Sequence, residues 1–146
     1  MKENEIKFRL RKITTGQFAT IDSEVIPNDT IKLNYGFGFG ASLEHSIVGC
    51  EAKFEFLSKE VPFIILSVKC DFEISPSTWE VLFNQEKAEI MLPVSLTSHL
   101  ATLTVGTARG ILHSKTENTE FNKFFLPTLN ITESLKNDIV IKTQKE

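Results

Sequence analysis

Cysteine and serine are the residues of this chain most able to perform nucleophilic chemistry, and neither stands in a catalytic pattern. The two cysteines, Cys50 and Cys70, lack the spacing of a zinc site and fall at apolar strand positions, where a thiol is normally inert. No serine occupies the Gly-x-Ser-x-Gly turn of the best-known hydrolases. The sequence contains no complete catalytic constellation, so we expect a protein that is not an enzyme and uses no cofactor or metal.

The histidines and a glycine-rich run are the remaining candidates for a metal or phosphate site. Of the histidines, His99 and His113 would share one helix face, but about 21 Å apart at 1.5 Å per residue. The run Gly36-Phe-Gly-Phe-Gly40 lacks the Gly-x-Gly-x-x-Gly spacing of a dinucleotide-binding loop. We interpret this run as a strand with one bare face.

The composition predicts one globular domain, residues 1–146, with 41% apolar and 24% charged residues. The net charge of −3 and the scattered basic residues are atypical of a nucleic-acid binder. The charged segment Met1–Lys7 is unlike a secretory signal, and the longest apolar run, Val61–Leu66, is far shorter than the roughly 20 residues that span a bilayer. We therefore expect a cytoplasmic protein that neither binds nucleic acid nor spans a membrane.

Period-two alternation predicts four strands in the first half of the chain, near residues 6–11, 31–39, 50–56 and 64–74. The last two strands are predicted to form a hairpin hinged near residue 60, with both thiols buried and reduced. The expected register pairs Phe56 with Ile64, Phe54 with Leu66, Cys50 with Cys70 and Glu51 with Lys69.

Two stretches are harder to assign. Thr14–Thr30 has no clear period, yet it is apolar for a loop, and we expect an irregular functional segment there. Residues 100–113 fit both a helix and a strand. A helix is favoured because apolar residues recur at helical spacing; the stripe is Leu96, Leu100, Leu103, Thr107 and Ile111.

Shorter signals mark the ends of helices. Ser77-Thr-Trp-Glu80 has the form of a capping box, and Pro93 suits the first residue of the long helix. Ser114–Glu120 reads as a polar loop. Asn130 with Glu133 predicts a second capping box and a short helix to about Asn137, followed by a frayed tail.

The order of these features resembles the SecB-like protein-export and antitoxin chaperones. The resemblance covers about Ile6 to Asn137, and its nearest local echoes are Thr107-Ala-Arg-Gly110 and Phe121-Asn-Lys-Phe-Phe-Leu-Pro-Thr-Leu-Asn-Ile131. It implies an α+β fold in which a long helix and a short C-terminal helix pack on one face of a four-stranded antiparallel sheet. It also implies a long loop that crosses after the first strand, here Thr14–Thr30.

The same resemblance implies a function. Such chaperones bind unfolded or aggregation-prone polypeptides in apolar grooves without ATP, and many are dimers or tetramers. The implied partners are unfolded clients, further copies of the chain, and either an antitoxin or an export motor. Such chaperones usually carry a metal-binding tail for the export motor, but Lys142–Glu146 has no Cys or His. This difference favours generic or antitoxin-type chaperoning. The implied polypeptide-binding residues are Phe18, Ile21, Val25, Ile26, Tyr35, Phe37, Phe39 and Trp79.

Two other functions fit the same pattern. The apolar surface could serve only for self-association in a structural or assembly subunit. A small-molecule carrier or enzyme could hold a ligand between the sheet and the helix. An exposed apolar groove favours a chaperone, a buried subunit contact favours a structural protein, and a closed pocket favours a carrier.

Overall fold

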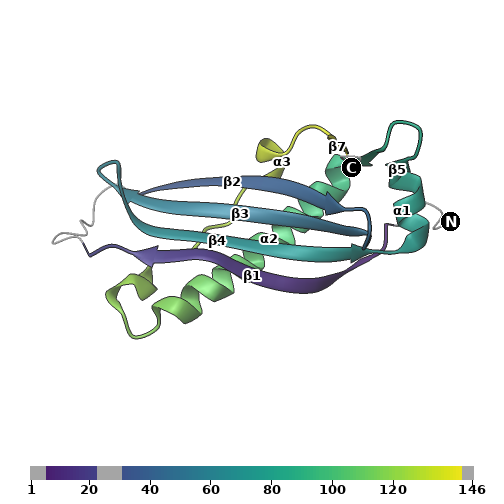
Figure 1. Cartoon of the computed structure of the whole chain (residues 1–146). Coiled ribbons are helices and arrows are strands. Elements are labelled where there is room, and N and C mark those ends of the chain that lie inside the picture. Colours follow the sequence, from purple (N-terminus) through teal and green to yellow (C-terminus); the bar gives the residue numbers. More distant parts are fainter. Residues whose placement is uncertain (1–5, 23–30, 143–146) are drawn as a thin grey trace.

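Four antiparallel strands and one long helix form the body of the molecule (Figure 1). The computed structural model describes residues 6–22 and 31–142. The strands are β1 Phe8–Thr20, β2 Ile31–Ser42, β3 Ile47–Ser58 and β4 Val61–Ile74, in the sheet order β1-β4-β3-β2. Helix α2, Val94–Thr116, crosses one face of this sheet. The predicted α+β class is confirmed, and the long helix settles the open choice for residues 100–113.

The β3–β4 hairpin has the predicted register. Cys50 lies opposite Cys70 and Phe54 lies opposite Leu66, as strict alternation along both strands requires. The turn is tighter than expected, because Lys59 and Glu60 alone make it. Both have positive φ angles, 51° and 66°, as a two-residue hairpin turn whose twist matches that of the strands demands.

The first strand is about twice as long as predicted. Thr14–Thr20, expected to be loop, continues β1 along β4 to the pair Thr20 and Ile64. Register shifts lie between Leu10 and Lys12 and between Thr15 and Gln17. Each shift adds a residue that breaks the period of two, which hid the strand from periodicity. Residues 23–30, including the predicted contacts Val25 and Ile26, lie outside the described residues.

Helix α2 buries a different stripe from the predicted one. The side chains that α2 buries against the sheet and its neighbours are Leu96, Thr97, Leu100, Ala101, Thr104, Val105, Ala108, Leu112 and Thr116. Leu103 is 41% exposed. The buried hydroxyls of Thr104 and Thr116 donate to carbonyls one turn back, which satisfies them inside an apolar layer. The predicted end at Ser114 is early by one turn, and Pro93 is the N-cap rather than the first helical residue.

Of the smaller elements, α1, β5 and β7 gather at one end of the sheet (Figure 1). Helix α1, Pro76–Leu82, begins at the cap residue Ser75, two residues before the predicted Ser77. The remaining elements are β5 Phe83–Asn84, β6 Glu89–Leu92, η1 Glu120–Lys123, α3 Ile131–Ser134 and β7 Ile139–Lys142. The second sheet, β5-β6-β7, was not predicted, and it includes Lys142 from the expected tail. No described helix is long and apolar enough to cross a membrane.

Candidate functional site

The helix-bearing face of the sheet has a covered centre and two flanks. Helix α2 lies over β3 and β4, while β1 and β2 form the edges on either side. One row across the sheet runs from Phe18 through Leu66 and Phe54 to Tyr35. Three strand spacings separate its ends, about 14 Å. The structure therefore divides the predicted site between the two flanks rather than gathering it in one groove.

Along β1, apolar side chains on the helix-bearing face remain open to solvent. Leu10 is 46% exposed and Ile13 is 47% exposed. Leu103 of α2 lies on the same side, because His99, one turn before it, packs edge-on against the ring of Phe8 with centroids 5.3 Å apart. We call these three exposed residues, Leu10, Ile13 and Leu103, the β1 flank.

Two of the predicted contacts stand at the far end of β1. Phe18 is half-buried, and the Lys115 ammonium lies 5.9 Å from the centroid of its ring. Ile21 follows the strand and is 44% exposed, with its backbone N–H bonded to the carbonyl of Phe63. Phe18 thus extends the apolar surface of the β1 flank, and Ile21 is an exposed apolar side chain just after the strand.

Aromatic side chains of β2 form the opposite flank. Tyr35, Phe37 and Phe39 share the helix-bearing face with Leu33, and we call these four residues the β2 flank. Tyr35 meets Phe37 edge-on with centroids 5.9 Å apart and is 37% exposed. The intervening glycines are exposed on the other face, and a Cβ added at any of them would meet nothing within 4 Å.

Trp79 stands apart from Phe18. It is half-buried on α1, between β4 and α2 in the chain, as expected. Helix α1 is tied to the beginning of β1, because the Lys7 backbone N–H donates to Thr78 Oγ1 at 3.1 Å. Phe18 lies eleven residues farther along the chain, two of them extra residues at the register shifts of β1, and so roughly 30 Å away at the rise of a strand.

A connector between η1 and α3 covers the β2 side of α2. We define it as residues 124–130; it contains three half-buried or buried apolar side chains, Phe124, Leu126 and Leu129. Phe124 packs against Phe63 with centroids 4.9 Å apart and against Phe56 at 6.1 Å. The β2 flank is therefore closed from one side by the chain itself, whereas the β1 flank is open.

Arg109 holds this connector. Its Nε donates to the carbonyl of Leu126 at 2.8 Å and its Nη2 to the carbonyl of Pro127 at 2.8 Å. A basic side chain on a helix surface most simply predicts an ion pair, but Arg109 binds two backbone carbonyls instead. The planar guanidinium presents two donors at the spacing of adjacent carbonyls, a geometry that side-chain type alone does not reveal.

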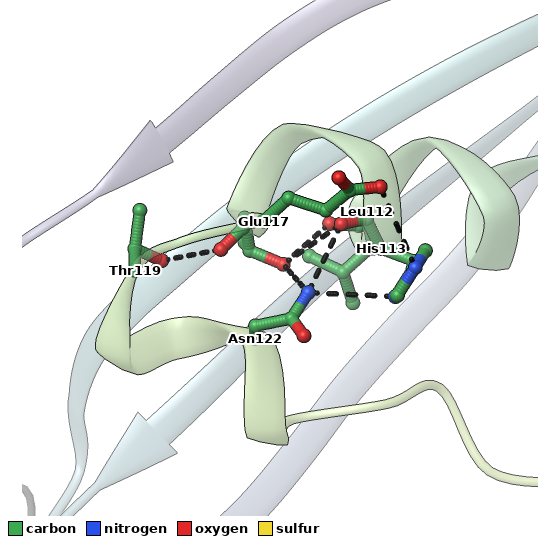
Figure 2. Close-up of polar contacts among 6 residues, drawn as sticks. Leu112, His113, Glu117, Thr119 and Asn122 are labelled. Carbon is green, nitrogen blue, oxygen red and sulfur yellow. Dashed lines mark hydrogen bonds and ion pairs between the residues drawn. The ribbon is translucent and has the colours of Figure 1, made fainter.

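The end of α2 is closed by a polar cluster (Figure 2). Asn122 Nδ2 donates to the His113 carbonyl at 3.1 Å and to Thr116 Oγ1 at 3.1 Å, and it lies 3.4 Å from His113 Nδ1. Glu117 Oε1 lies 3.6 Å from His113 Nε2. These contacts satisfy carbonyls of the last turn, so the cluster acts as a helix end. Within residues 6–22 and 31–142, no group of three or more His, Cys, Asp or Glu side chains could hold a metal ion.

The two cysteines are free, opposed and fully buried. Burial raises the pKa of Cys50 to about 11, and a hydrogen bond between its side chain and that of Thr104 opposes this shift. A thiol with so high a pKa is almost wholly protonated at neutral pH and is a poor nucleophile. The geometry thus fits packing in the core.

The arrangement of sheet, crossing helix and connector places the chain in the class of SecB-like folds. It resembles the SecB-like chaperone Rv1957 of Mycobacterium tuberculosis, solved in complex with a ChAD peptide from the Rv1956 HigA1 antitoxin, with a TM-score of 0.54 and 10% identity over 84% of this chain and 90% of the other. A protein of unknown function from Streptococcus agalactiae aligns with a TM-score of 0.38 and 11% identity, over 86% of this chain and 98% of its own. No family model and no curated protein matches the chain.

Proposed function

We propose that the chain binds unfolded or aggregation-prone polypeptides, without catalysis and without a nucleotide. The observation that carries this proposal is the β1 flank, where three apolar side chains are each more than 40% exposed on one side of the helix-bearing face. Apolar side chains gathered in one place on a surface mark a site for another chain. The SecB-like neighbour, described as a chaperone in complex with an antitoxin peptide, supports this direction.

The proposed contacts extend beyond the flank. Phe18 and Ile21 continue the β1 flank and are proposed as client contacts, with Val25 and Ile26 after them in the sequence. Burial of apolar side chains without fixed polar partners gives little sequence selectivity, as a binder of many unfolded chains requires.

Contacts at the β2 flank and at α1 are proposed for longer clients. Tyr35, Phe37 and Phe39 offer rigid aromatic surface at a small entropic cost. Trp79 would touch only a client that runs the length of β1.

Edge strand β1 favours an extended client. It is at the end of the sheet order and is exposed from Arg9 to Gln17. Such a strand presents unpaired backbone donors and acceptors to an added strand, while Leu10 and Ile13 supply apolar contacts on one face. Basic side chains of this strand pair with Glu73, where Arg9 Nε lies 2.6 Å from its Oε1.

The second candidate is a structural subunit that uses the same surface for self-association. The exposed edge of β1 favours it, because an unpaired edge also accepts a second copy of the chain. We propose a homo-oligomer, a dimer or a tetramer, in either case, and a cytoplasmic location. As a further partner, we propose an antitoxin rather than an export motor.

Suppression of aggregation tests the leading function. A chemically denatured client protein diluted into buffer should scatter less light when the chain is present at near-stoichiometric ratio, with no nucleotide added. Unchanged scattering at several-fold excess would refute the proposal. Suppression that required ATP would contradict its nucleotide-independent form.

A further inference from the structure

The connector, residues 124–130, resembles the proposed clients in being apolar and without regular secondary structure. Its sequence Phe-Phe-Leu-Pro-Thr-Leu-Asn is mostly apolar, and it runs without helix or strand between η1 and α3. Phe125 is 57% exposed, whereas Leu126 is 2% exposed. A segment of extended backbone with alternate anchors is what a bound unfolded chain would offer to an apolar surface.

Few polar contacts hold the connector in place. Within the described residues, Arg109 is the only side chain of α2 that hydrogen-bonds to it, through the carbonyls of Leu126 and Pro127. Beyond the connector, Ser134 of α3 donates its hydroxyl to the Tyr35 hydroxyl of the β2 flank at 3.3 Å. The connector pairs with no strand of the described residues, so it can leave without breaking the ladder of either described sheet.

The anchors of the connector are the surfaces that a client would use. Phe124 packs against Phe56 and Phe63, and Leu33 of the β2 flank lies opposite Phe56 on the neighbouring strand. The connector therefore competes with any client for the apolar surface between α2 and β2. The β1 flank has no such internal occupant among the described residues.

We propose that the connector is a strap that occupies the β2 side of α2 in the free protein, that Arg109 latches it, and that an extended apolar client displaces it. This inference rests on the proposed function and adds a second, gated subsite to the open β1 flank. Arg109 is a positioning residue here, since it acts through the backbone of the connector. Loosening the latch raises the fraction of molecules whose subsite is free, and apparent affinity rises with that fraction.

The test compares Arg109→Gln with the unaltered protein and with Lys87→Gln. The control makes the same change of charge at an exposed side chain in the turn between β5 and β6, away from the connector. Hydrogen exchange should be about tenfold faster between Phe124 and Leu135 in Arg109→Gln, with β3 and β4 unchanged. Reduced, carboxymethylated α-lactalbumin, a permanently unfolded probe, should bind several-fold more tightly, because the strap is then displaced at less cost.

Each outcome decides the inference. Unchanged exchange would show that Arg109 does not latch the connector. Faster exchange with weaker or equal probe binding would show that the connector lines the subsite rather than occupying it, and would overturn the strap. If Arg109→Gln does not fold, Arg109→Lys keeps the charge with a single point donor and should give intermediate changes in the same directions.

Failure of the proposed function would look different. The unaltered protein would then bind no probe, and displacement by a client would be refuted with it. The exchange comparison needs no probe, and it would still decide whether Arg109 holds the connector. Probe binding by the unaltered protein, with faster connector exchange once the probe is bound, supports both.

Discussion

Leu100 and Leu103 provide a matched pair that separates core from binding surface. They lie one turn apart on α2, and Leu→Ala is the same chemical change at both. Leu100 is 0% exposed on the buried side of α2, whereas Leu103 is 41% exposed on the β1 flank. Leu100→Ala should lower the free energy of unfolding by about 3 kcal/mol, the transfer term plus a cavity. Leu103→Ala should cost about 1 kcal/mol, because folding buries only a little over half of its side chain.

The effect on client binding should have the opposite order. Full burial of a leucine side chain contributes about 2 kcal/mol. Client contact can bury only the part of Leu103 that is still exposed, 41%, which corresponds to about 0.8 kcal/mol, or roughly a fourfold rise in Kd. Leu100→Ala should leave Kd nearly unchanged wherever the protein stays folded.

Two measurements on each variant check the reasoning. Urea unfolding followed by tryptophan fluorescence gives the stability change, and fluorescence anisotropy of the labelled unfolded probe gives Kd. A Leu103→Ala protein that is as unstable as Leu100→Ala would contradict the open flank. A Leu103→Ala protein that binds the probe normally but dissociates into monomers would favour self-association over client binding.

Four further predictions concern other parts of the molecule. The free energy of unfolding should fall at high pH because of Cys50. Its folded pKa of about 11 lies above the ordinary value of 9.0, so its contribution to stability is complete below pH 9 and is lost as pH rises toward 11, as alkaline urea titrations of the chain and of Cys50→Ala can verify. Thiol titration should find both cysteines unreactive until the protein is denatured. Ile21→Asp should weaken probe binding with little change in melting temperature, whereas Phe18→Asp should also destabilise the fold because its half-buried ring lies opposite Leu66; equal melting temperatures for the two variants would contradict this difference. Size-exclusion chromatography with light scattering should find a dimer or tetramer, and a monomer of 16.5 kDa at micromolar concentration would exclude self-association.

Local periodicity alone determined much of this fold. Alternation along both strands predicted the pairing of Cys50 with Cys70 without knowledge of the rest, whereas the two-residue turn and the register shift between Phe56 and Leu57 that offsets it were not predicted. The long helix could be predicted for the same reason, since its apolar residues repeat at helical spacing. These features depend on residues that are close in sequence or joined by one tight turn.

Long-range pairing decided what periodicity missed. The two register shifts in β1 make sense only against β4, more than forty residues later, so Thr14–Thr20 was assigned to a loop. The second sheet needed β7 to complete it, and its strands have only two to four residues, too few for a period to be visible.

The candidate site depended most on tertiary structure. Alternation predicted that Tyr35 would lie on the apolar face of a strand, whereas Phe18 was expected in a loop. Only the strand order separated them by three spacings and placed α2 between them. The direction of Arg109 and the exposure of Leu103 were likewise set by which side of α2 meets the connector and which side meets β1. Contacts between elements that are distant in sequence form only when the whole chain packs together. Residue type and local spacing alone do not predict them.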